Sequence, residues 1–259
     1  MIDSLYIGAT GMHAQQTSID VISNNLANVN TNGFKKSRVD FEDLLYRDTI
    51  RTNSLISASD NVHRLGMGAA VAGTGKVFTT GDIKKTDGPL DLAIQGQGFF
   101  EVVLPTGELG YTRSGAFQIN RDGLLSTSEG YQLSGSLQVP IDATSIVVEA
   151  NGRVLANVPG ETRPVEIGNL EMANFSNPGG LTPLGENLYL PTQKSGDPIK
   201  GIPGENGLGT VAQGFLETSN VKLVEEMINL ILAQRAYEIN SKVVQASDEI
   251  MSITNNLYR

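Results

Sequence analysis

The chain of 259 residues is 39% hydrophobic, which is enough to build one large domain or two smaller ones. Its formal net charge of −9 argues against a nucleic-acid partner, because phosphates require a basic surface, and against docking on an anionic membrane. Cysteine is absent, so disulfides and thiol chemistry are excluded, and no stretch approaches the roughly 18 apolar residues of a membrane span.

Residues 1–33 predict a helix that begins after Asp3 or Ser4 and runs to about Asn28. The first residues lack the basic start and apolar run of a secretory signal, so we expect no cleavable signal peptide. Apolar residues at near-heptad spacing form a narrow seam along this helix, which predicts a contact with another helix. The seam consists of Leu5, Met12, Ile19, Ile22 and Leu26.

Residues 34–75 show no clear period, and we interpret them as an extended connector or long loop. Loops of this length are uncommon inside compact domains, so we expect this segment to be functional or to be ordered by something outside the monomer. Its glycine-rich end, residues 66–76, does not match a phosphate-binding loop, because Ala70 and Val77 stand where glycine and serine or threonine are required.

Residues 76–214 predict an all-β domain, a sandwich or a small barrel. All ten prolines lie between Pro89 and Pro203, and 22 of the 29 glycines lie between Gly81 and Gly214. Alternating apolar residues at 117–119 and 165–167, and the apolar run at 146–148, are typical of strands.

Residues 215–259 contain neither proline nor glycine, which favours one long helix beginning near Asn220. Apolar residues step along it by four and three, so this helix also carries a seam. The second seam consists of Leu232, Ala236, Ile239, Val243, Ala246, Ile250, Ile253 and Leu257.

The sequence offers no catalytic constellation, no cofactor motif and no metal-ligand spacing. His13 has no acidic residue three or four positions away, and His63 lies in the polar connector, so both histidines favour surface or packing roles. Gly96 and Gly98 begin a dinucleotide-binding pattern, but Glu101 stands where the third glycine is required. We therefore expect no enzyme activity and no bound cofactor or metal.

The terminal seams have two interpretations. They could form an intramolecular helical hairpin, or they could meet neighbouring copies of the chain. Ala236 and Ala246 bury little area, and the two helices differ in length, so a protruding pair would be marginal in a free monomer. We favour contacts between copies, which by head-to-tail repetition make a ring or an open helical filament.

Four ordered motifs give the chain a family resemblance. Residues 24–35 (NNLANVNTNGFK) resemble the N-terminal signature of bacterial flagellar rod and hook proteins, with Asn24, Asn25, Leu26, Ala27, Asn28, Asn32, Gly33 and Phe34 as matching positions. Residues 214–221 (GFLETSNV) with 234–238 (QRAYE) resemble the C-terminal signature. Residues 92–100 (LAIQGQGFF) and 111–117 (YTRSGAF) are similar to the β-domain motifs of this family.

The resemblance implies an α+β fold in which long terminal helices form a coiled-coil-like layer between subunits, an extended connector packs against neighbouring subunits, and a central all-β domain lies outside the layer. Length, residues 185–189 (GENLY) and the stretch 46–77 resemble distal rod members. Such a subunit would polymerise into the drive shaft of the basal body across the periplasm, enclose the export channel and transmit torque from motor to hook.

The partners implied by the resemblance are further copies of the chain, proximal rod and hook subunits, the ring proteins around the rod and the flagellar type III export apparatus. A proximal rod subunit is the nearest alternative within the family. A secreted module that binds cell-wall polymer, with the helices as an oligomerisation stalk, is the alternative from another class. Its weakness is the aromatic content of 6%, which leaves few rings for a sugar platform.

Overall fold

The computed structural model describes residues 2–49, 63–135, 137–160, 163–205 and 207–257. The chain separates into two compact units. We call residues 1–26, 37–75 and 222–259 the helix unit, and residues 27–36 and 76–221 the β unit. Long helices near the two termini and a mostly β central region confirm the α+β class.

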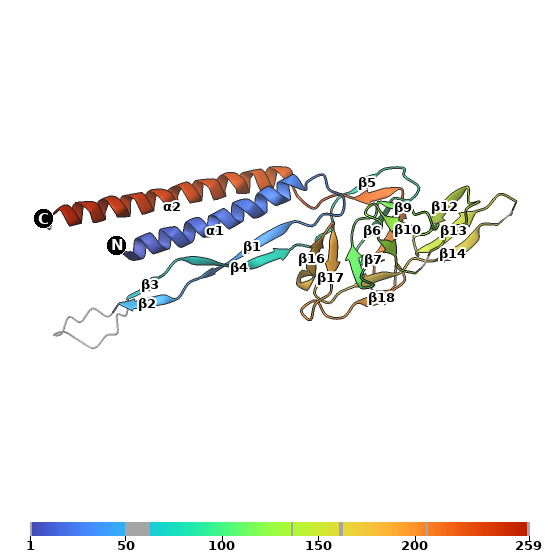
Figure 1. Cartoon of the computed structure of the whole chain (residues 1–259), viewed down its shortest axis with the longest axis horizontal. Helices are drawn as coiled ribbons and strands as arrows, with labels where there is room; N and C mark the ends of the chain where they lie inside the picture. Colours follow the sequence, from blue (N-terminus) through green and yellow to red (C-terminus); the bar gives the residue numbers. More distant parts are fainter. Residues whose placement is uncertain (1, 50–62, 136, 161–162, 206, 258–259) are drawn as a thin grey trace. The chain divides into compact units, whose positions relative to one another are not determined.

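Both terminal helices occur where the sequence predicts them: α1 covers Ile2–Ala27 and α2 covers Leu223–Leu257 (Figure 1). Acidic residues occupy the first turn of each helix, Asp3 in α1 and Glu225 with Glu226 in α2, where the positive end of the helix dipole stabilises them. The 35 residues of α2 continue without a break because this segment lacks proline and glycine.

The two helices pack against each other through small residues of α1. A Cβ atom built on Gly8 would lie 2.7 Å from Cγ2 of Val244, and one on Gly11 would lie 2.8 Å from Nδ2 of Asn240. The contact positions fall along α2 as they rise along α1, so the helices run antiparallel. The glycines, which weaken an isolated helix, here permit a close approach of the two backbones.

The segment expected as an extended connector forms two pairs of strands. β1 (Ser37–Asp43) pairs with β4 (Ala69–Lys76), and β2 (Tyr46–Thr49) pairs antiparallel with β3 (His63–Gly66). Each pair joins residues that are far apart in the sequence, so a local reading of periodicity does not reveal it. Residues 50–62, within the polar stretch of the expected connector, lie outside the described residues.

The paired strands contact α1 at a glycine. A Cβ atom on Gly68 would overlap the hydroxyl of Thr10, so only glycine allows the strand turn to approach the helix this closely. Gly68 has a φ of +104°, which disfavours other residues independently. Gly68 of the connector therefore serves packing within the chain.

The described part of the β unit consists of short strands and one 3-10 turn. They are β5 (Ile83–Lys85), β6 (Leu92–Gln95), β7 (Phe99–Val103), β8 (Leu109–Thr112), β9 (Phe117–Ile119), β10 (Leu125–Thr127), β11 (Gln132–Leu133), β12 (Ser145–Val148), β13 (Arg153–Asn157), β14 (Val165–Asn169), β15 (Met172–Asn174), η1 (Pro178–Gly180), β16 (Thr182–Gly185), β17 (Leu188–Leu190), β18 (Ile199–Gly201), β19 (Thr210–Gln213) and β20 (Phe215–Glu217). The strands predicted at 117–119, 146–148 and 165–167 are confirmed as parts of β9, β12 and β14.

The largest sheet has nine strands in the order β16-β17-β8-β7-β11-β10-β9, with β15 beside β7 and β18 beside β15. Smaller sheets are β12-β13-β14, β19-β6 and β20-β5. In the described residues the large sheet has open ends at β16, β9 and β18, so the strands form no closed barrel of the kind we considered. Turn glycines with positive φ, such as Gly123 at +79° and Gly152 at +83°, lie between strands that pair in one sheet, β9 with β10 and β12 with β13.

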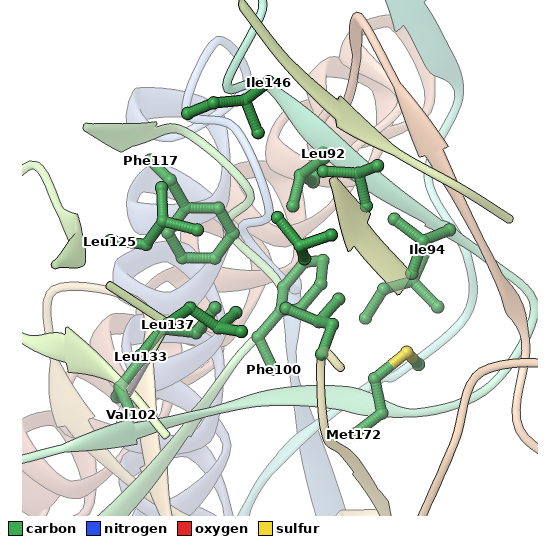
Figure 2. Close-up of a cluster of buried hydrophobic side chains, with 14 of the residues drawn as sticks. Leu92, Ile94, Phe100, Val102, Phe117, Leu125, Leu133, Leu137, Ile146 and Met172 are labelled. Atoms are coloured by element: carbon green, nitrogen blue, oxygen red, sulfur yellow. The ribbon is translucent and has the colours of Figure 1, made fainter. Parts of the chain in front are cut away.

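The core of the β unit gathers apolar side chains from several sheets. In Figure 2 the labelled side chains of Leu92, Ile94, Phe100 and Met172 point toward one another, and each is at most 2% exposed. Phe100 and Phe117 meet edge to face with ring centroids 5.1 Å apart, a favourable aromatic geometry. This core gives the β unit its own stability and a rigid frame for the polar cluster described below.

Candidate subunit interface

The apolar seam predicted on α2 faces outward along most of its length. Its six large apolar members are between 43% and 80% exposed: Leu232, Ile239, Val243, Ile250, Ile253 and Leu257. Ala246 is also exposed, and Ala236 is half-buried. Contiguous exposed apolar surface of this kind is typical of a site where another protein binds.

A different stripe of α2 is covered within the chain. The buried residues of α2 are Glu226, Ala233 and Ser247, and Asn240, which packs beside Gly11, continues their seven-residue spacing. Ala233, Asn240 and Ser247 each come directly after a residue of the predicted seam in the sequence. One residue corresponds to about 100° around a helix, so the covered stripe and the outward seam occupy neighbouring sides.

The seam predicted on α1 is less exposed than the one on α2. Ile22 is buried at 8% exposure, and Leu5, Met12, Ile19 and Leu26 are half-buried. The two predicted seams therefore differ in their surroundings: contacts within the chain already cover part of the α1 seam, whereas the α2 seam has an apolar face open to a partner.

The signature segment 24–35 contributes a buried polar contact to the helix unit. Asn25, 1% exposed, donates through Nδ2 to the carbonyl of Ser37 at 2.8 Å and to Oε2 of Glu226 at 3.3 Å. Its Oδ1 accepts the backbone N–H of Ser37 at 2.8 Å. One side chain thus connects the end of α1, the start of β1 and the first turn of α2, whereas Asn24 and Ala27 are exposed.

The rest of the signature forms a turn in the β unit. The hydroxyl of Thr31 donates to Oδ1 of Asn28 at 3.2 Å, and the carbonyl of Asn32 accepts from Nδ2 of Asn187 at 3.2 Å. Gly33 has a φ of +72°, and a Cβ atom there would lie 2.6 Å from the backbone nitrogen of Ser114. Only glycine fits this position.

Phe34 follows the turn and is buried at 7% exposure. The ammonium of Lys76 lies 4.4 Å from the centre of the Phe34 ring, a cation–π distance. Burial lowers the pKa of Lys76, because the charged ammonium loses hydration. The aromatic position of the signature is therefore a packing residue of the β unit.

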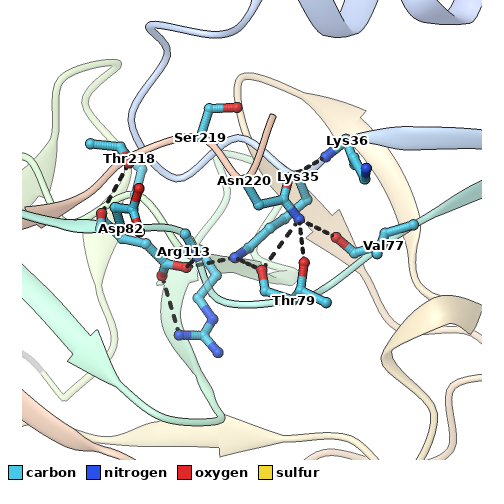
Figure 3. A network of polar contacts seen from close by, with 12 residues as sticks. Lys35, Lys36, Val77, Thr79, Asp82, Arg113, Thr218, Ser219 and Asn220 are labelled. Atoms are coloured by element: carbon cyan, nitrogen blue, oxygen red, sulfur yellow. Dashed lines mark hydrogen bonds and ion pairs between the residues drawn. The ribbon is translucent and has the colours of Figure 1, made fainter. Parts of the chain in front are cut away.

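A buried ionic cluster that the sequence analysis did not identify includes the last residue of the signature segment, Lys35 (Figure 3). Nζ of Lys35 lies 2.6 Å from Oε1 of Glu217, and both side chains have 0% exposure. Nη1 of Arg113, a side chain 4% exposed, lies 3.3 Å from Oε2 of the same carboxylate. Lys35 also donates to the carbonyl of Thr79 at 2.7 Å, and Arg113 donates through Nη2 to the carbonyl of Gly96 at 2.7 Å.

Burial and charge act in opposite directions on this cluster. Loss of hydration lowers the pKa of Lys35, and the Glu217 carboxylate opposes that shift. Burial likewise lowers the pKa of the Arg113 guanidinium, again against the attraction of Glu217. Charged groups stay in such a site when they are paired and hydrogen-bonded, and here one carboxylate serves two cations.

No sequence spacing could have revealed this cluster. Lys35, Arg113 and Glu217 belong to three separate motifs, 24–35, 111–117 and 214–221. The available signal was that each of these three motifs contains a single charged residue. The structure shows that these three charges meet at one point.

The described residues contain no group of three or more side chains suited to hold a metal ion. Of the helices in the same part of the chain, neither is long and apolar enough to cross a membrane. The polar groups are instead engaged in structural contacts, as with Asn220, which donates to the carbonyl of Val77 at 2.8 Å and accepts the N–H of Lys36 at 2.7 Å.

Three parts of the chain match models of known protein families. Residues 5–35 match the flagella basal body rod protein model, residues 93–156 match the flagellar hook protein FlgE/F/G D1 domain, and residues 212–257 match the flagellar basal body rod FlgEFG protein C-terminal model. The matches fall in the order expected from the motifs. The fold, the outward seam and these models together define an axial structural protein of the flagellum.

Individual relatives cover the whole chain. The flagellar basal-body rod protein FlgG of Buchnera aphidicola from Acyrthosiphon pisum is 47% identical, over 99% of this chain and 100% of its own. FlgG of Borreliella burgdorferi is 43% identical over 100% of both chains, and FlgF of Caulobacter vibrioides is 32% identical over 96% of this chain and 95% of its own. The chain belongs to the flagellar basal-body rod protein family and is a structural subunit of the rod, and its family is not one of enzymes.

Proposed function

We propose that the chain polymerises into the distal part of the flagellar rod through the outward seam of α2. The observation that carries this proposal is the apolar face of α2, with Leu232 61%, Ile253 60% and Leu257 80% exposed, on a helix whose neighbouring side is already packed against α1. An isolated chain gains nothing from exposing these residues, because apolar burial contributes about 25 cal/mol per Å². A neighbouring copy of the chain can bury them.

The preference for the distal rod rests on the relatives. Seven relatives named FlgG are 39–47% identical to this chain, whereas one named FlgF is 32% identical. A proximal rod subunit therefore has less support. In this proposal the terminal helices of many copies form a coiled-coil-like inner layer around the export channel, and the β units lie outside it.

The partners follow from this assignment. Proximal rod and hook subunits would meet the two ends of the polymer, ring proteins would surround it, and the flagellar type III apparatus would export the subunit into the periplasm. The rod would transmit torque and catalyse nothing. Membership of the rod family supports these partners, and each one is a proposal for this chain.

The test places a charge in the seam. Ile250→Asp puts a carboxylate among apolar side chains of the proposed contact, where burying it is costly, so polymerisation should fail. Gln245→Asp adds the same charge at an exposed polar position on another side of α2 and is the matched control. Electron microscopy and sedimentation of the concentrated full-length chain should show straight polymers for wild type and control, and none for Ile250→Asp. Normal polymers of Ile250→Asp would refute the seam assignment.

A further inference from the structure

The buried cluster of the β unit contains more positive than negative charge. In the described residues, Lys35 and Arg113 both direct their ion pairs to Glu217, and the 2.6 Å contact of Lys35 is typical of a charge-assisted hydrogen bond. One carboxylate cannot neutralise two cations. The cluster is therefore one negative charge short at a place where water is excluded.

Arg113 also holds a donor without a partner. Its Nε is buried and makes no hydrogen bond within the described residues, although Nη1 and Nη2 are both engaged. Buried unpaired donors are rare in folded proteins because each costs free energy, so an unpaired one calls for an explanation. The unpaired Nε leaves the positive charge of the guanidinium incompletely compensated, so an anion beside Arg113 would supply the missing charge.

A pocket of about 470 Å³ opens beside this guanidinium. Arg113 lines it together with Gln97, Asn174 and the rings of Phe78 and Phe99. Asn174 accepts the N–H of Phe175 at 2.9 Å through Oδ1, which leaves its Nδ2 to donate. The lining thus combines a cation, amide donors and aromatic walls, a chemistry suited to a carboxylate on a short apolar stem.

We propose that this pocket binds a carboxylate side chain of a second copy of the chain. The inference rests on the proposed function, in which copies of one chain are neighbours. Charge complementarity favours this occupant, because each copy carries 28 acidic residues against 19 basic ones and a formal net charge of −9. An assembly of such copies gains when an acidic side chain of one enters the positive pocket of the next.

The first arm of the test measures carboxylate binding to the full-length chain, with acetate as the probe. Acetate should shift the NMR signals of the Gln97 and Asn174 side-chain amides. Asn174→Asp keeps the acceptor that holds Phe175 but turns the donor into a carboxylate, so acetate affinity should fall by about tenfold or more. Asn151→Asp is the matched control, because Asn151 is exposed and its Oδ1 likewise accepts a backbone N–H, that of Arg153 at 3.0 Å. Absence of any acetate response at the pocket amides overturns the proposal.

The second arm measures polymerisation of the same variants. Asn174→Asp should raise the concentration needed for polymers by about tenfold, and Asn151→Asp should match wild type. If acetate binds but both variants polymerise equally, the pocket takes a free anion and the second copy is the wrong occupant. If Asn174→Asp is impaired while Ile250→Asp polymerises normally, the seam fails and the pocket stands. A wild-type chain that forms no polymer removes both proposals.

Discussion

Lys35 and Glu217, which are 182 positions apart in the sequence, form an ion pair of 2.6 Å with neither side chain exposed. Glu217 also accepts the backbone N–H of Gly81 at 2.8 Å through the same oxygen. The pair therefore holds three distant segments of the β unit at one point. Lys35 and Glu217 both lie inside family motifs, so some positions of these motifs make contacts within the chain.

Removing the carboxylate of this pair should be costly. Glu217→Gln leaves Lys35 and Arg113 as buried cations without a counter-charge, and breaking such a pair costs about 3–5 kcal/mol of unfolding free energy. Urea unfolding followed by tyrosine fluorescence would measure it, because the chain has no tryptophan. Glu225→Gln removes an exposed partner of Lys222 and should cost no more than about 1 kcal/mol. Equal effects of the two variants would contradict the buried pair.

Gly33→Ala should separate backbone strain from steric overlap when compared with Gly107→Ala. Both glycines have positive φ, +72° and +84°, so alanine costs each about 1 kcal/mol in backbone energy. At Gly107 nothing lies within 4 Å of the new Cβ, whereas at Gly33 the backbone of Ser114 lies 2.6 Å away. Gly33→Ala should therefore lower the urea midpoint clearly more than Gly107→Ala, and similar midpoints would contradict the tight turn.

Asn25→Asp should loosen the helix unit at neutral pH. The change deletes the donor that serves Ser37 and places a carboxylate beside that of Glu226, with an expected loss of about 2 kcal/mol. Hydrogen exchange in α1 and the first turns of α2 should accelerate. Acid should partly reverse the effect, because protonation of one carboxylate ends the repulsion. Asn24→Asp, at an exposed position in the same turn, is the control, and an equal effect there would contradict the bridging role of Asn25.

The β unit should lose stability in strong alkali through Tyr111. Burial, with a smaller contribution from the Glu101 carboxylate, raises the pKa of Tyr111 from 10.0 to about 12. The folded state therefore holds this proton more tightly than the unfolded state. The resulting stabilisation is complete below pH 10 and is lost as the pH rises through 12.

Tyr111→Phe should reduce this alkaline loss, as measured by urea midpoints across that pH range. Tyr6→Phe removes a hydroxyl from a side chain 49% exposed on α1 and is the matched control. An unchanged alkaline loss in Tyr111→Phe would show that other groups cause it.

Parts of the fold could be predicted from local pattern alone. The absence of proline and glycine after Phe215 predicted α2, and alternation predicted the strands around Phe117 and Val165. The strand pairs of residues 37–76 escaped prediction, because their pairing joins Tyr46 to Gly66 and depends on backbone groups that every residue carries. The closed barrel that we considered likewise depended on strand order, which periodicity does not report.

The sequence by itself determined the two helices, the turn-rich β region, the apolar seams and the family, because each of these depends only on the type and spacing of residues along the chain. Tertiary structure alone decided which sides of the helices meet and which charges are buried together. It packs α1 against the side of α2 that carries Asn240 and Val244, and so leaves Leu232 and Ile253 facing outward. It also brings Lys35, Arg113 and Glu217 together across the chain, since long-range contacts depend on folding geometry that a local pattern does not contain.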